Sequence, residues 1–173
     1  MQEETLELET RRVIHEYILK NPGSHLRKIA RELNINLSTL RYHLDYLEKK
    51  ELVASEKESN QKAYFVAWKL SSKDKQACRL LQQKRFRDVI LVIIMTPGIN
   101  HRKIAEKLAI TPSTLSKYLK LLEDRGVVHH QKAGREKCYR VVDEKQIMDL
   151  LLTYKKSFWD KFVDNVLEIY FER

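Results

Sequence analysis

A segment that occurs twice at a fixed spacing is the feature that most constrains how this chain can fold. Residues 21–69 laid over residues 96–144, with a constant shift and no gap, agree at 19 of 49 positions. At the centre of the copies lie NLSTLRYHLDYLEKKELV and TPSTLSKYLKLLEDRGVV. Two copies are too few, and each is too complete, for a solenoid whose repeats cannot close their own core. The sequence therefore predicts one small domain present twice.

A first helix is predicted at the start of each copy. Residues 86–95 are apolar nearly all round, as in a buried helix, whereas residues 6–20 carry one apolar stripe. The members of that stripe are Leu6, Val13, Ile14, Tyr17 and Ile18. Both helices should end at a Pro-Gly pair, because proline cannot continue a helix and glycine accepts the turn.

A short second helix and a longer third helix follow in each copy. The predicted ranges are 25–33 and 37–50 in the first copy, and 100–108 and 112–125 in the second. Leucines three or four residues apart form the buried stripe of each third helix, and its other positions are expected to face outward. Asn36 and Thr111 are the expected N-caps, and Pro112 suits the first helical position, where its missing N–H costs nothing.

Two runs rich in β-branched and aromatic residues follow each third helix and predict hairpins, with turns around 58–61 and 133–136. This order of elements is that of a winged helix-turn-helix, in which the third helix enters the major groove. The expected fold is mainly α with small β-hairpin wings, as two winged helix-turn-helix domains in tandem plus a C-terminal helical arm. The expected boundaries are 1–70 for the first domain, 71–85 for a linker helix, 86–143 for the second domain and 144–173 for the arm.

The linker reads as a helix over 71–84, with Ser72 as its cap, that continues toward the first helix of the second copy through 85–88. It contains neither Gly nor Pro, so we expect a stiff connection. A stiff connection would hold the two third helices in a preferred relation and let them read one extended site.

The charge of the chain is concentrated in its middle. The net charge of +9 divides into +1 over 1–72, +10 over 73–142 and −2 over 143–173. Such a concentration could be a solvated face, but a protein that sits on a polyanion would need it.

The two repeated segments resemble a known class of proteins. NPGSHLRKIARELNINLSTLRYHLDYLEKKELV and TPGINHRKIAEKLAITPSTLSKYLKLLEDRGVV are similar to winged-helix regulators of the ArsR and MarR type, whose recognition helix reads S-T-x-[SR]-x-[HY]-L. Two such units followed by YKKSFWDKFVDNVLEIY look like the tandem winged-helix transcriptional regulators common in archaea. The resemblance implies sequence-specific binding of double-stranded DNA and regulation of transcription. It is more specific for the fold than for DNA binding, since a fold does not determine a function.

The resemblance places two sets of residues of the third helices toward DNA. They are Ser38, Thr39, Arg41 and Tyr42 in the first unit, and Ser113, Thr114, Ser116 and Lys117 in the second. Hydroxyls at a helix N-terminus can donate to phosphate, and Arg41 is suited to a bidentate contact with a guanine edge. The counterpart of Arg41 is Ser116, and the charge moves to Lys117 and Lys120, which bind phosphate as point charges. The first unit is therefore expected to specify the sequence, and the second to position the protein.

The wings and the second helices supply further candidates. The second wing carries Lys132, Arg135 and Lys137, which could reach a phosphate strand or the minor groove. For the first wing, whose tip is EKESNQK, a solvated hairpin without a contact is the preferred interpretation. The second helices begin with further cations that could touch the DNA backbone, although an exposed helix would carry such residues anyway. These are Arg27, Lys28, Arg102 and Lys103.

Enzyme and metal motifs are absent from the sequence. It has no glycine-rich phosphate loop, no H-E-x-x-H and no nucleophile elbow, so we expect no enzyme. The histidines lack a matching set of ligands, and Cys78 and Cys138 have no C-x-x-C spacing, so we expect neither metal nor cofactor.

The longest apolar run, 89–95, is far shorter than the roughly 20 residues that span a bilayer, and the acidic start does not resemble a signal peptide. A soluble cytoplasmic protein without membrane contact is expected.

Apolar and aromatic residues recur through the C-terminal arm, and one chain seldom exposes so much of this surface. The favoured interpretation is a homodimer in which the arm pairs with its copy. The residues expected at this dimer contact are Leu151, Tyr154, Phe158, Trp159, Phe162, Val166 and Ile169. The alternative is an arm that packs across its own chain.

Two other functions remain open from the sequence. The paired winged helices could be a protein-interaction scaffold without specific DNA readout, in which case affinity should depend little on salt. Binding to structured RNA is less favoured, because a helix does not fit the deep, narrow groove of A-form RNA. The sequence does not indicate the operator, the direction of regulation or any small-molecule effector.

Overall fold

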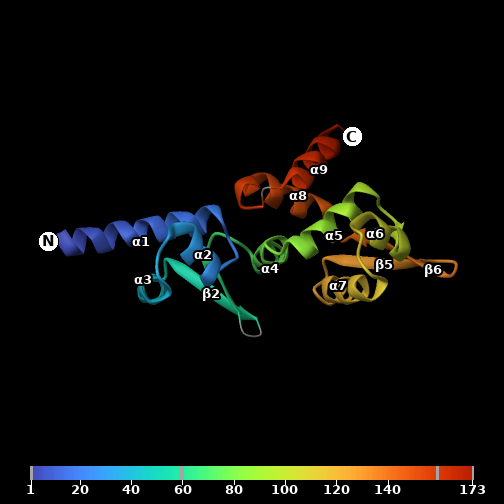
Figure 1. The fold of residues 1–173 in the computed structure, drawn as a ribbon. Coiled ribbons are helices and arrows are strands. Elements are labelled where there is room, and N and C mark those ends of the chain that lie inside the picture. The colour runs from blue at the N-terminus through green and yellow to red at the C-terminus, as the bar shows by residue number, and fades with distance from the viewer. Residues whose placement is uncertain (1, 59–60, 159, 173) are drawn as a thin grey trace. The chain divides into compact units, whose positions relative to one another are not determined.

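The computed structural model describes residues 2–58, 61–158 and 160–172. The chain forms two compact units, Met1–Arg79 and Leu80–Arg173 (Figure 1). In both units, three helices precede a hairpin whose strands join a third, very short strand. This is the winged helix-turn-helix order that the sequence predicts, and it occurs twice. In this described part of the chain, no helix is long and apolar enough to cross a bilayer.

The first unit contains three helices and a three-stranded antiparallel sheet of order β1-β3-β2. Its elements are α1 (Gln2–Lys20), β1 (Ser24–His25), α2 (Leu26–Leu33), α3 (Leu37–Lys49), β2 (Val53–Glu58) and β3 (Gln61–Val66). The hairpin prediction is confirmed, although the tip of its turn lies outside the described residues. The strand β1 was not predicted, because two residues are too short to show a periodicity. The helix α4 (Ser72–Leu81) begins in this unit.

The core of the first unit forms where α1, α2, α3 and β3 meet. Its fully buried side chains include Ile14, Ile18, Leu40 and Leu44. The stripe predicted for α1 is therefore only partly right, since Leu6 is 69% exposed. Figure 1 shows that the N-terminal half of α1 extends beyond the rest of the unit, away from the core that forms around Ile14 and Ile18.

The second unit repeats this plan and adds helices after the wing. Its elements are α5 (Lys84–Met95), β4 (Ile99–Asn100), α6 (His101–Leu108), α7 (Pro112–Asp124), β5 (Val128–Ala133), β6 (Glu136–Val141), α8 (Glu144–Thr153), the 3-10 turn η1 (Lys155–Ser157) and α9 (Lys161–Phe171). The sheet order is β4-β6-β5. As predicted, α5 is buried nearly all round, from Phe86 to Ile94.

Local signals in the sequence place the third helices correctly. Asn36 accepts a hydrogen bond from the backbone N–H of Thr39 at 2.8 Å, and Thr111 accepts one from Thr114 at 3.3 Å. Pro112 occupies the start of α7. In the second wing, Gly134 takes the left-handed φ of 64° that its tight turn requires. The predicted caps of the two third helices and the predicted turn of the second wing are confirmed.

The predicted linker helix is present but is shorter than expected, and it does not run on into the first helix of the second copy. The helix α4 ends at Leu81 and α5 begins at Lys84, with Gln83 in an extended conformation between them. A carbonyl released by the break, that of Leu81, accepts a hydrogen bond from Arg87 at 2.7 Å. Glutamine suits a helix, so periodicity could not reveal this break. The cap of α4 is Ser71, which accepts from the N–H of Asp74 at 3.1 Å, and not Ser72.

The C-terminal arm is also interrupted, and polar contacts attach its turn to the start of α5. Asp160 lies 2.7 Å from the ammonium of Lys84, and Gln82 donates to the hydroxyl of Ser157 at 2.7 Å. The hydrogen bond from Lys84 lowers the pKa of the Asp160 carboxyl below its ordinary value. The arm thus folds back on its own unit, where α9 packs against α5.

Most of the side chains expected at a dimer contact are buried within the chain. Phe158 is 1% exposed, and Leu151, Tyr154 and Val166 are also buried. Phe162 is half-buried, Ile169 is 38% exposed, and Trp159 lies outside the described residues. This burial is what the alternative interpretation, packing of the arm on its own chain, leads one to expect. The homodimer remains a prediction.

Candidate nucleic-acid interface

The N-terminal ends of α3 and α7 present the hydroxyl groups that the resemblance places toward DNA. Ser38 and Ser113 are exposed, whereas Thr39 and Thr114 are half-buried beside the caps. Ser38 donates to the side chain of Asn36 at 2.7 Å, so its hydroxyl must exchange that bond to donate to a phosphate. Ser38 and Ser113 therefore remain the more accessible candidates of the four.

Arg41 lies on the outer face of α3. Its side chain is exposed, and no ion pair with another residue in the described ranges restrains it. The guanidinium can therefore donate two parallel hydrogen bonds to a base edge. The neighbouring Tyr42 is 53% exposed and turns toward the first helix, where its hydroxyl lies 3.4 Å from the Glu7 carboxylate.

A contact between Arg11 of α1 and Tyr46 of the first recognition helix was not predicted from the sequence. Arg11 lies 2.5 Å from Glu7, and its guanidinium stacks 3.8 Å from the ring centroid of Tyr46 on α3. In the second unit the position of Arg11 is taken by Phe86, which meets Tyr118 edge to face at 5.4 Å. The first recognition helix thus contacts α1 through a cation–π pair, whereas the second contacts α5 through an aromatic pair, with the guanidinium of Arg85 5.8 Å from the ring centroid of Tyr118. Only the repeat alignment could have indicated this difference.

His43 is the polar residue that α3 buries, contrary to the expectation that only leucines line its inner side. It is 4% exposed, and its Nδ1 has no hydrogen-bond partner in the described structure. Burial lowers the pKa of His43, the positive charge of Arg11 lowers it further, and Glu7 partly opposes them. His43 is therefore neutral in the folded unit at neutral pH.

The stability of the first unit should fall as the solution becomes acidic. The folded pKa of His43 lies below the unfolded value of about 6.5, so the unfolded chain binds more protons in that range and the free energy of unfolding decreases as pH falls through it. Urea midpoints at about pH 7 and about pH 5.5 should therefore differ more for the native chain than for His43→Gln. The exposed His129→Gln is the control and should behave like the native chain. Equal pH dependence for all three proteins would contradict this role of His43.

In the second unit, α7 presents cations without local partners. Lys117 and Lys120 are exposed, and neither makes an ion pair with another described residue. Ser116 is more constrained, because it donates to the carbonyl of Pro112 at 2.9 Å and lies 3.0 Å from His101 Nε2. Lys117 and Lys120 are therefore the more accessible candidates for a phosphate contact, whereas the hydroxyl of Ser116 is engaged within the helix-turn-helix.

The cations of the second helices differ in their availability. Arg27 and Lys103 are exposed, and Lys28 is half-buried. The Nε of Arg102 lies 2.8 Å from the carboxylate of Glu106, one turn further along α6. This carboxylate offsets the charge of Arg102, so Arg102 is the weakest of these candidates for a phosphate contact.

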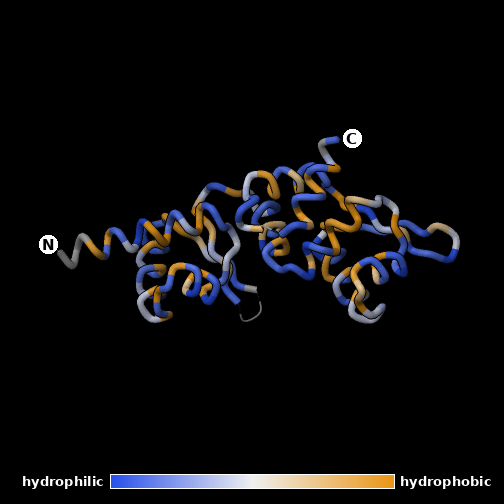
Figure 2. Tube along the Cα trace, turned by 45° about the horizontal axis from the view of Figure 1, so that its top comes forward, coloured by the Kyte–Doolittle hydropathy of each residue, from blue (hydrophilic) through white to orange (hydrophobic). Residues whose placement is uncertain are grey.

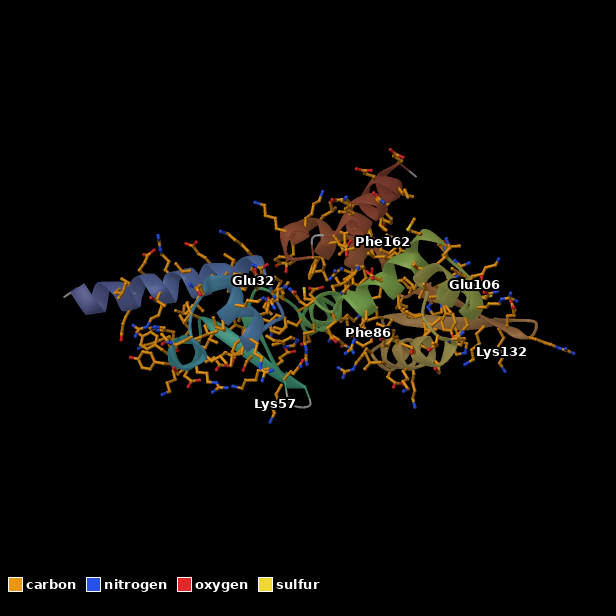
Figure 3. The ribbon with its side chains drawn as sticks, viewed as in Figure 1. Glu32, Lys57, Phe86, Glu106, Lys132 and Phe162 are labelled. Carbon is orange, nitrogen blue, oxygen red and sulfur yellow. The ribbon has the colours of Figure 1, made fainter. Side chains whose placement is uncertain are left out.

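Both wings place two lysines directly opposite each other, and among the described residues a carboxylate pairs with one of them in the first wing but not in the second. Lys57 faces Lys62 across the first hairpin, and Lys62 pairs with Glu48 at 3.7 Å. Lys132 faces Lys137 across the second hairpin (Figure 3). The counterpart of Glu48 is Glu123, which instead contacts His130. Like charges placed opposite each other repel, so this pair is a candidate contact for an anion.

The second wing is polar along its length and is fixed to α6 at its base. Figure 2 shows that hydrophilic residues prevail along its strands. Arg135 at the turn is exposed, like Lys132 and Lys137. Asn100 caps α6 by accepting from Lys103 N–H at 2.9 Å and donates to Glu136 at 2.8 Å. Asn100 therefore couples the position of the wing to that of the helix-turn-helix, a role that its sequence position alone did not indicate.

No group of three or more His, Cys, Asp or Glu side chains is arranged to hold a metal ion, as far as the described residues go. The candidate side chains on α3, on α7 and on the second wing are mainly hydroxyls and cations. Their chemistry is that of hydrogen bonding and charge attraction to an anionic polymer.

The fold and these faces define a protein with two winged helix-turn-helix units in tandem. Residues 8–78 match a family described as an N-terminal HTH domain, and residues 87–129 match a family described as winged helix-turn-helix DNA-binding. A protein of Methanocaldococcus jannaschii, named as an uncharacterized HTH-type transcriptional regulator, is 34% identical over 140 residues. The match covers 81% of this chain and 35% of that protein, so the chain spans about a third of the relative's length.

Proposed function

We propose that this chain binds double-stranded DNA and regulates transcription. Two family matches to helix-turn-helix domains and the name of the relative support this function. The observation that carries it is that α3 and α7 both bury leucines on one side and expose hydroxyls and unpaired cations on the other. A regulator of this kind would act in the cytoplasm, where the DNA is.

In this proposal the two units contribute differently. The second unit supplies phosphate contacts through Lys117, Lys120 and the uncompensated lysines of its wing, which contribute affinity for any duplex. The first unit supplies sequence preference through Arg41, because a fork of donors can distinguish a guanine edge from other bases.

The decisive experiment recovers genomic fragments bound by the native chain and titrates one of them with salt. We expect the recovered fragments to share a motif and the logarithm of the binding constant to fall linearly with the logarithm of the salt concentration. Fragments without a common motif and binding that depends little on salt would support the protein-interaction scaffold instead.

Replacing Lys117 with alanine should weaken binding to specific and random duplexes alike. The loss of one phosphate contact is expected to reduce the slope of the salt dependence by about one. The exposed Lys145, which lies on α8, provides the matched control, and Lys145→Ala should leave the slope unchanged. A slope that Lys117→Ala does not alter would place Lys117 away from the DNA backbone.

We also propose that the chain acts as a homodimer, through apolar surface that α9 leaves exposed around Ile169. Sedimentation analysis should show a dimer that Ile169→Lys dissociates, with Lys145→Ala as the control. A monomer at all concentrations of the native chain would contradict the dimer without affecting the DNA-binding proposal.

A further inference from the structure

A hollow of about 370 Å³ lies on the second unit, outside the DNA-facing surface. It is lined by Val92 and Met95 of α5, Lys107 and Leu108 of α6, and Phe162 of α9. Figure 3 labels Phe162 on α9, the helix that packs against α5. The volume lies in the range of sites that hold small molecules.

The lining combines apolar walls with a single charge. Val92, Met95, Leu108 and Phe162 offer aliphatic, thioether and aromatic surface. Lys107 is exposed, no carboxylate lines the hollow, and no ion pair with the described residues engages the ammonium group. An apolar body with one negative group would complement this arrangement.

The first unit does not reproduce the hollow, although the two units are copies. The repeat alignment places Lys20 where the second unit has Met95, and Glu32, which Figure 3 labels on the first unit, where it has Lys107. One member of the apolar wall is thus replaced by a cation, and the cation of the lining by an anion. The helix at the sequence position that corresponds to α9 is α5, and it belongs to the second unit. The combination of apolar walls and a free ammonium is specific to the second unit.

We propose that this hollow binds an amphipathic anion, namely a carboxylate with an unbranched alkyl chain. The alkyl chain packs against Met95, Leu108 and Phe162, and the carboxylate accepts a hydrogen bond from Lys107. The carbonyl end of α6 lies nearby and carries about half a negative charge, which the full charge of the ammonium outweighs. This proposal does not depend on the proposed DNA binding.

The test measures binding of octanoate to the full chain by titration calorimetry below the micelle concentration. We expect saturable binding with one site per chain. Lys107→Gln should weaken it about tenfold, because a charge-assisted hydrogen bond is lost. Lys145→Gln, which removes an exposed lysine elsewhere in the same unit, should leave the affinity unchanged.

Two further measurements separate this site from adventitious binding. Octylamine has the same chain with the opposite charge and should not bind the native protein. Met95→Phe adds bulk to the wall and should also weaken octanoate binding, with circular dichroism confirming that the helices are retained. Equal affinity for octanoate and octylamine, an unchanged affinity in Lys107→Gln, or the absence of saturation would overturn the proposal. DNA affinity measured on the same samples keeps its failure distinct from that of the proposed function.

Discussion

Arg41→Ala is expected to relax sequence preference at one base pair by about 1 to 3 kcal/mol while leaving affinity for random DNA nearly unchanged. The reason is that the guanidinium group of Arg41 is exposed on α3 and forms no ion pair with any residue in the described ranges. A guanidinium contributes to discrimination only where it meets the correct base edge. Binding constants for an operator and for variants of it, measured at one salt concentration, provide the check.

The repeat supplies the control for this experiment. Ser116 occupies the position of Arg41 in the second unit and is held by local hydrogen bonds to Pro112 and His101. Ser116→Ala should therefore change discrimination much less than Arg41→Ala. If Arg41→Ala weakens operator and random DNA equally, Arg41 contacts phosphate, and the division of roles between the units is wrong.

Phe65→Ala should destabilise the first unit by about 3 to 5 kcal/mol, the largest effect on stability expected here. Phe65 lies on β3, is fully buried, and has the ammonium of Lys75 at 5.7 Å from its ring centroid. Removing the ring leaves a cavity as well as losing its transfer free energy. Urea titration of the full chain, followed by circular dichroism, should show part of the helical signal lost at lower urea.

The matched variant for Phe65 is Arg140→Ala. Arg140 occupies the same register position in β6 but is exposed, so its removal should change stability by less than about 0.5 kcal/mol. Similar urea midpoints for the two variants would show that Phe65 is not a core residue of the first unit.

The parts of the fold that sequence analysis predicted correctly are those with short-range signals. The caps at Asn36 and Thr111 and the turn at Gly134 depend on residues at most three positions apart. The leucine stripe of each third helix repeats within one or two turns. Hence the order of elements, the duplication and the outward faces of α3 and α7 follow from the sequence alone.

The parts that sequence analysis missed depend on long-range packing. The stripe on α1 includes both Leu6 and Ile14, but only Ile14 finds a partner within the unit. The contact of Arg11 with Tyr46 joins residues on separate helices, and neither residue signals it. Asp160 likewise meets Lys84 only because the arm folds back.

The sequence by itself therefore determined what each segment forms and which copy carries which charge, because helix propensity, capping and turns act through neighbouring residues. The tertiary structure alone decided which apolar surfaces are covered. Burial of an apolar side chain is favourable whatever segment covers it, because the hydrophobic effect has no direction. The covering segment can therefore come from anywhere in the chain. Leu6 and Ile14 illustrate the difference, because both belong to the predicted stripe of α1 and only Ile14 is buried.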